Sequence, residues 1–250
     1  MPSSEIVNSR ALQSILRLLR FARQELGAVF ALGVIWGGIA AFVEIADDMT
    51  EADGQALDQQ ILDFVRPGPE AGDPIGPHWL ETAMLDITAL GGLSVLLLFA
   101  LITTGVLLIQ KKPWSALMLA VSLAGGLLLS EVTKGLFERD RPAEIYRTVE
   151  TINASFPSGH ALLSTVFYLT LGVMLERAFA RRRMKIYLLS TAVLVALLVG
   201  VSRVYLAAHW ATDVMGGWAL GAAWAMVCWL VAYIVQRQAL KRGLGAEEPG

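Results

Sequence analysis

One stretch of the chain combines two cations with a predicted helix start, features that together suit an oxyanion. Lys134 and Arg141 come first, and Ser158, Gly159 and His160 follow directly before a long apolar run. A Ser-Gly pair that opens a helix presents backbone N–H groups, which favour an anion such as phosphate. Arginine offers paired N–H donors and lysine a compact charge. This stretch is therefore a candidate phosphate site.

A second stretch adds another arginine and a histidine with a carboxylate partner. Arg203 precedes His209, and Asp213 lies four residues after His209, on the same face if this segment is helical. A histidine nucleophile needs one free ring nitrogen and an acceptor for the other, which Asp213 could provide. His160 could then protonate the departing oxygen. These residues alone do not decide which histidine attacks.

The composition predicts an integral membrane protein. Of 250 residues, 55% are hydrophobic and only 17% are charged, and the mean hydropathy is +0.57. These values lie well outside the usual range of a soluble domain. The net charge of −2 and the short, scattered basic clusters argue against a nucleic-acid partner. The single cysteine excludes an internal disulfide and a thiolate metal cluster.

Six apolar runs predict an all-α fold, a six-transmembrane-helix bundle that forms a single domain over residues 26–236. The runs cover residues 26–43, 91–109, 114–133, 161–175, 186–201 and 214–235. The segment 1–25 has the spacing of an amphipathic interfacial helix, and 237–250 is predicted to be a C-terminal tail. Residues 44–90 are acidic and rich in turn formers, and predict a loop with one short helix near 57–65.

The positions of lysine and arginine predict the orientation in the membrane. Basic residues gather in the N-terminal segment, at Lys111 and Lys112, over 177–185 and over 237–242, which are alternate connections. Basic connections favour the cytoplasm, so we expect both termini inside a multi-pass cell membrane protein. The loops 44–90, 134–160 and 202–213 would then face outward. Both reactive stretches would lie at this outer surface.

Each candidate residue also has an ordinary structural interpretation. Lysine and arginine at helix ends often extend to the membrane interface, and a lone Ser-Gly pair is usually only a helix cap. His78 has no ligand partner at useful spacing and is interpreted as a solvated loop histidine. Glu138, Arg139 and Asp140 are interpreted as solvated or ion-paired spacer residues. Three cations and two histidines in two loops on one side are harder to explain by packing alone.

The residues from Lys134 to Pro142, from Pro157 to His160 and from Ser202 to Asp213 resemble the three motifs of the type 2 phosphatidic acid phosphatase family. These membrane lipid phosphatases are related to bacterial phosphatidylglycerophosphatase B and to the vanadium haloperoxidases. The resemblance covers the six-helix body, while the N-terminal segment and the acidic loop lie outside the motifs. It implies a helical core of the haloperoxidase type and a metal-independent phosphatase without a cofactor.

The resemblance also implies a role for each residue. His209 attacks phosphorus to give a phosphohistidine, Asp213 orients it, and His160 acts as acid and then as base. The residues implied to bind the phosphate are Lys134, Arg141, Ser158, Gly159 and Arg203. The substrate is expected to be a membrane lipid phosphate or diphosphate. Undecaprenyl diphosphate is preferred on family grounds, with phosphatidylglycerol phosphate and phosphatidate as alternatives.

Four other functions are weaker. A vanadate-dependent haloperoxidase would use the same anion site, but that subgroup is soluble or peripheral. A lipid transporter or scaffold would place functional charges within the apolar runs, which contain almost none. A hydrolase that uses Ser158 with His160 lacks the Gly-x-Ser-x-Gly elbow. A metal-assisted phosphatase would need a cation site among several nearby positive side chains. Its candidate ligands are Glu131, Glu138, Asp140 and Asp213.

Overall fold

Helices are the only regular secondary structure among the residues that the computed structural model describes, which confirms the predicted all-α class. It describes the backbone of residues 3–67, 73–149, 153–241 and 243, and side chains from residue 25 onward in these ranges, except residues 177, 240 and 241. The helices are α1 (Ser3–Asp48), α2 (Ala52–Val65), α3 (His78–Ala89), α4 (Leu93–Ile109), α5 (Pro113–Phe137), the short 3₁₀ helix η1 (Glu144–Tyr146), α6 (Gly159–Arg177), α7 (Arg182–Tyr205) and α8 (Ala211–Lys241).

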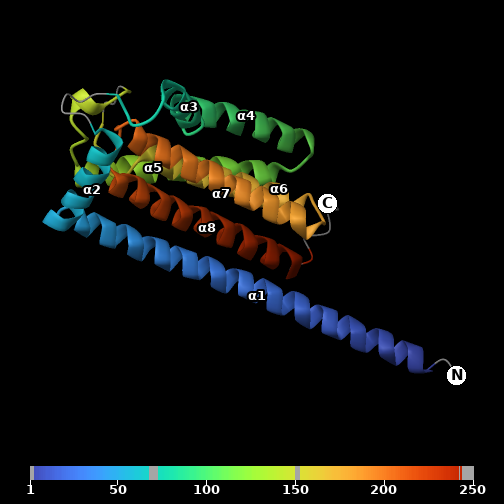
Figure 1. The fold of residues 1–250 in the computed structure, drawn as a ribbon. Helices are drawn as coiled ribbons and strands as arrows, with labels where there is room; N and C mark the ends of the chain where they lie inside the picture. Colours follow the sequence, from blue (N-terminus) through green and yellow to red (C-terminus); the bar gives the residue numbers. More distant parts are fainter. Residues whose placement is uncertain (1–2, 68–72, 150–152, 242, 244–250) are drawn as a thin grey trace.

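Most of these helices run side by side as a bundle (Figure 1). Among the described residues, α5, α6, α7, α8 and the Glu25–Asp48 part of α1 are each long and apolar enough to cross a membrane. The predicted span 91–109 corresponds to α4, which is joined to α3 by a bend of 49°. This bent pair provides a sixth span if it is counted as one. Five of the six predicted apolar runs therefore become helices long enough to span a membrane, and the run 91–109 does so only together with α3.

The predicted loop 44–90 is more ordered than expected. The helix expected near 57–65 is α2, but α3 was not predicted. Leu80 and Met84 of α3 pack against a buried cluster that contains Tyr205 and Leu206. This tertiary packing stabilises a helix of 12 residues, which is too short to be stable on its own. Residues 68–72 of this loop lie outside the described residues.

Helix α1 packs along α8 and then projects beyond the bundle toward the N-terminus (Figure 1). The segment 3–25, expected to lie at the membrane surface, is helical and continuous with the first span. Ala31, Ile35, Phe42 and Ala46 form one buried stripe on α1. Gly38 lies in this stripe, and a Cβ atom there would lie 2.7 Å from the carbonyl oxygen of Ala219. The two helices therefore approach closely where α1 lacks a side chain.

The end of the bundle that carries Lys134, Gly159 and Arg203 is called the site end below. Three aromatic rings support it from within. Phe156 is fully buried, stacks on Phe42 of α1 with ring centroids 5.3 Å apart, and meets Phe137 edge to face at 5.1 Å. These rings fix the connection between α5 and α6 directly before Pro157. The start of α6 is thereby held against α1 and α5.

Close packing of α7 on α8 gives a testable consequence at Gly200. A Cβ atom there would lie 2.3 Å from the Trp218 ring, whose Nε1 donates to the carbonyl oxygen of Ala196 at 3.0 Å. We expect Gly200→Ala to displace this indole and to cost about 1–3 kcal/mol of stability, the usual range for overpacking. The measurement is the thermal unfolding midpoint of the purified protein in detergent.

The matched control for this variant is Gly105→Ala in α4, where an added Cβ meets no described atom within 4 Å. Its midpoint should stay the same or rise, because alanine favours a helix more than glycine does. Equal midpoints for the two variants would contradict the packing argument.

Candidate active site

The structure brings the predicted site residues to one end of the bundle. Lys134 lies in the last turn of α5, Arg203 lies near the end of α7, and Asp213 lies in the first turn of α8. The connections between these helices, together with the start of α6, supply Arg141, Ser158, Gly159, His160 and His209. Helix ends thus position every residue that was expected to act.

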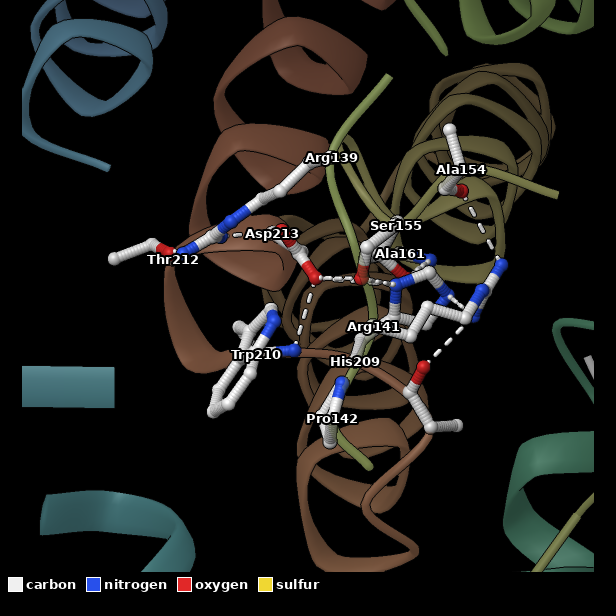
Figure 2. A network of polar contacts seen from close by, with 12 residues as sticks. Arg139, Arg141, Pro142, Ala154, Ser155, Ala161, His209, Trp210, Thr212 and Asp213 are labelled. Carbon is white, nitrogen blue, oxygen red and sulfur yellow. Dashed lines mark hydrogen bonds and ion pairs between the residues drawn. The ribbon is translucent and has the colours of Figure 1, made fainter. Parts of the chain in front are cut away.

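His209 is buried and is held on both sides of its ring. Its Nδ1 lies 3.4 Å from Oδ2 of Asp213 and 3.4 Å from the hydroxyl of Ser155, while its Nε2 lies 3.1 Å from Nη1 of Arg141. Because a guanidinium can only donate, Nε2 must accept in this arrangement and Nδ1 carries the proton. Figure 2 shows this ring between Arg141 and Asp213. The lone pair of Nε2 therefore faces the cation.

The protonation state of His209 suits a nucleophile. Burial lowers the pKa of His209 to about 4, against the hydrogen bond and the charge of Asp213, which raise it. The charges of Arg141 and Arg203 also lower this pKa. The ring is consequently neutral near pH 7, and its unprotonated nitrogen is available for attack.

Arg141 is fixed by backbone carbonyl oxygens. Its Nε donates to Asn153 at 2.7 Å, its Nη1 to Ala208 at 2.7 Å, and its Nη2 to Ala154 at 3.3 Å. These acceptors come from the connection before α6 and from the connection before α8. They hold the guanidinium beside His209 without an opposing charge. Such a prearranged cation can bind an anion with little reorganisation.

Arg203 has a buried donor that an anion could satisfy. Its side chain is buried, with 5% exposure, and its Nη1 donates to the hydroxyl of Thr88 in α3 at 3.1 Å. Its buried Nε has no hydrogen-bond partner among the described residues. A buried donor without a partner costs about 1–3 kcal/mol, and more when it is charged. A bound anion would satisfy this N–H group.

Lys134 lies beside the start of α6. A Cβ atom at Gly159 would lie 3.6 Å from Nζ of Lys134 and 3.2 Å from the hydroxyl of Ser130. The glycine therefore leaves room for the ammonium group next to the first N–H groups of the helix. Ser158 is fully buried, and its hydroxyl accepts from the backbone N–H of Ala161 at 3.5 Å as the helix cap. Its contact with phosphate stays a prediction.

His160 points toward the α3–α4 bend. Its Nε2 lies 3.9 Å from the position of a Cβ atom at Gly92, and its backbone oxygen lies 3.3 Å from one at Gly91. His160 is also within electrostatic range of His209 and of the cations Lys134, Arg141 and Arg203. The structure thus places the second histidine on the cationic side of the site.

Three side chains that contact the predicted site residues were not themselves predicted to belong to the site: Arg139, Ser155 and Thr88. Asp213 is fully buried, and besides His209 it binds Nη1 of Arg139 at 2.6 Å, the backbone N–H of Trp210 at 2.9 Å and the hydroxyl of Ser155. Arg139 was interpreted as a solvated or ion-paired spacer, and it proves to be ion-paired inside the site. Figure 2 shows these groups around the carboxylate. Neither Ser155 nor Thr88 lies at a sequence spacing from the predicted residues that would have indicated a role in the site.

The remaining titratable candidates lie apart from this arrangement. His78 is solvated as expected, with its side chain 91% exposed and its Nδ1 3.6 Å from Glu81, although it opens α3 rather than lying in a loop. Within the described residues, no three histidine, cysteine or acidic side chains gather as a metal site. The four carboxylates considered as metal ligands therefore do not form such a group.

A polar cavity of about 620 Å³ opens next to Lys134 and Arg141. It is also lined by Glu131, Glu138, Arg139, Asp140, Arg147 and Asn153, so its wall carries charges of both signs. The cavity places solvent-accessible space directly beside two of the candidate phosphate ligands.

Comparison with known proteins agrees with this arrangement. Residues 115–237 match the model of the PAP2 superfamily. Phosphatidylglycerophosphatase B of Bacillus subtilis (strain 168) is 34% identical over 146 residues, which are 57% of this chain and 70% of the relative. An undecaprenyl-diphosphatase of Sulfolobus acidocaldarius is 30% identical over 124 residues, which are 47% of this chain and 56% of that relative.

Two solved structures share the fold. The transmembrane PAP2 type phosphatidylglycerolphosphate phosphatase of Bacillus subtilis has a TM-score of 0.74 and 28% identity, covering 81% of this chain and 98% of that one. Aquifex aeolicus LpxE is similar in fold alone, with a TM-score of 0.52, 20% identity and coverage of 68% and 93%. With 70% of the Bacillus relative covered, the chain belongs to the PAP2 superfamily and is a multi-pass membrane lipid phosphatase, a hydrolase of phosphoric ester or diphosphate bonds.

Proposed function

We propose that this phosphatase transfers the phosphoryl group of a membrane lipid to Nε2 of His209 and then to water. The observation that carries the proposal is the position of that nitrogen. It accepts from Arg141 at 3.1 Å, while Asp213 and Ser155 hold the opposite side of the ring. A phosphate bound by Arg141 would place phosphorus close to the nucleophile.

The phosphate oxygens would be shared among several donors. Arg141, Arg203 and Lys134 supply charge, and the buried Nε of Arg203 is a donor that this anion would satisfy. The first N–H groups of α6, at Gly159 and His160, complete the set. Ser158 supports them by capping the helix. These donors would also stabilise the charge that develops in the transition state.

The chemical steps need only two histidines and one water molecule. The lone pair of Nε2 forms a bond to phosphorus while the bond to the lipid oxygen breaks. His160, protonated once the bound phosphate offsets the nearby cations, gives that oxygen its proton. Asp213 holds the Nδ1 proton and balances the positive charge on the imidazolium ring of the phosphohistidine. Neutral His160 then takes a proton from water as the water oxygen attacks phosphorus. The P–N bond breaks, inorganic phosphate leaves, and both histidines return to their starting states.

Replacement of each histidine separates the two steps. His209→Ala should abolish both the phosphoenzyme and phosphate release in a chelator-containing assay. His160→Ala should lower kcat about 10²–10⁴-fold with a lipid alkyl phosphate, because general acid catalysis supplies that range. With a nitrophenyl phosphate, whose leaving group needs no proton, the same variant should still form the phosphoenzyme and accumulate it. Phosphate release by His209→Ala at the normal rate would contradict the mechanism.

We also propose that the site end faces the outside of the cell. The connections between α4 and α5 and between α6 and α7 lie at the opposite end of the bundle and carry Lys111, Lys112 and Arg181. Basic connections favour the cytoplasm. The cations at the site end are instead engaged by carbonyls, hydroxyls and carboxylates of the site. This arrangement supports an inner membrane protein with both termini in the cytoplasm.

Cysteine labelling tests the orientation. In a Cys228→Ala background, Ile145→Cys at the exposed 3₁₀ helix should react with a membrane-impermeant maleimide on intact cells. The matched variant Lys111→Cys, on the exposed opposite connection, should react only after the cells are opened. The reverse pattern would overturn the orientation.

Among substrates, we propose undecaprenyl diphosphate first and phosphatidylglycerol phosphate as the alternative. Attack on the terminal phosphorus of a diphosphate expels a phosphate monoester, which leaves more easily than an alkoxide. The polar cavity beside Lys134 and Arg141, with Arg147 on its wall, offers room near the second phosphate. The named activities of the relatives support both substrates equally.

A substrate panel in detergent tests this preference. Undecaprenyl diphosphate, phosphatidylglycerol phosphate and phosphatidate would be compared by kcat/KM under the same conditions. We expect all three to be hydrolysed and the diphosphate to give the highest value, by about tenfold, which corresponds to about 1.4 kcal/mol in the barrier. A higher kcat/KM for either monoester would reject the preference and leave the phosphatase mechanism intact.

A further inference from the structure

We propose that Asp58, in the acidic segment between the first two spans, is a positioning residue for the reaction. It would act through Arg139 on Asp213, and through Asp213 on the nucleophile His209. The inference rests on the proposed function, because it assigns His209 as the nucleophile. It gives a role to a helix, α2, that lies outside the three motifs.

The contacts form a continuous chain across the molecule. Oδ2 of Asp58 lies 2.6 Å from Nη2 of Arg139, and Nη1 of the same guanidinium lies 2.6 Å from Oδ1 of Asp213. Oδ2 of Asp213 then faces Nδ1 of His209 at 3.4 Å. Four side chains from α2, the α5–α6 connection, α8 and the α7–α8 connection are thus linked in series. Figure 2 shows the Arg139, Asp213 and His209 members of this series.

The side chains in this series are largely enclosed by protein, so a change at one of them affects the geometry of the others. The Asp58 side chain is 2% exposed, that of Asp213 0% and that of Arg139 13%. The guanidinium also lies over the Trp210 ring, 5.8 Å from its centroid. A planar guanidinium fixed between two carboxylates and a ring has little freedom to turn. Because Arg139 occupies Oδ1 of Asp213, the other carboxylate oxygen is directed toward His209.

Asp58 also holds the start of α8 directly. Its Oδ1 accepts from the backbone N–H of Thr212 at 3.0 Å, and its Oδ2 accepts from the Thr212 hydroxyl at 2.5 Å. The carboxylate therefore caps the helix whose first turn carries Asp213. A purely structural role would consist of this tether alone. The positioning role requires, in addition, the ion pair with Arg139.

The variant Asp58→Asn separates the two roles. An asparagine carbonyl oxygen can still accept from the Thr212 N–H group, so the helix cap is kept, while the charge that orients Arg139 is lost. The chosen readouts are kcat, KM, inhibition by inorganic phosphate, and the rate of phosphoenzyme formation after a rapid quench into alkali. Asp63→Asn, at an exposed acid of the same helix, is the matched control.

We expect Asp58→Asn to lower kcat and the phosphorylation rate about 10- to 100-fold, the range of one charge-assisted hydrogen bond. KM and the phosphate inhibition constant should stay within about twofold, because Lys134, Arg141 and Arg203 are untouched. Arg139→Gln should give a similar loss, and the double variant should lose little more, because both changes break the same link. Asp63→Asn should behave as the unmodified protein.

Two outcomes would overturn the inference. One is an unchanged phosphorylation rate in Asp58→Asn. The other is a loss of phosphate affinity and thermal stability in parallel with kcat, which would identify Asp58 as a tether only. His209→Ala is measured alongside as the reference. If that variant keeps its activity, the proposed function itself fails; if it is inactive while Asp58→Asn is normal, only the positioning role fails.

Discussion

The fully buried carboxylate of Asp213 is the group on which the site end depends. A buried charge is costly unless it is paired and hydrogen-bonded, so it needs several partners at once. They come from Arg139, Ser155, His209 and the backbone N–H of Trp210, which lie on two connections between different helices. The interaction that stabilises these connections is therefore the same one that orients the histidine.

Close packing between α8 and the connection before α6 positions the groups of this polar network. Gly216 and Gly217 of α8 are in close contact with the connection before α6, since a Cβ atom would lie 2.6 Å from the Phe156 ring at Gly216 and 2.7 Å from the Ser158 oxygen at Gly217. The backbone N–H of Ser158 also donates to the backbone carbonyl oxygen of Asp213 at 2.9 Å. Small residues on α8 thus let the cap of α6 lie directly against the first turn of α8.

The sequence predicts those parts of the molecule whose signals are local. Apolar runs predict the spans, and closely spaced His209 and Asp213 predict an oriented histidine. Helix α3 was missed because its stability comes from packing on Tyr205 and Leu206 rather than from its own residues. Asp58 was missed because it contacts Thr212, 154 positions away, and lies in an acidic segment that is typical of a solvated loop. Arg139 lies between two acidic residues, and for the same reason it was interpreted as a solvated or ion-paired spacer rather than as part of the site.

The partners of the cations divide the site into two sides. Behind His209, Arg139 is balanced by two carboxylates, so it orients Asp213 without adding an excess of positive charge. In front of the ring, Arg141 is held by carbonyl oxygens and Arg203 by the Thr88 hydroxyl, and these neutral acceptors leave their charges available. At short range in a protein, such charges attract a phosphate strongly. Arg141, the cation next to Nε2, therefore lies on the side of His209 from which phosphorus would approach in the proposed mechanism.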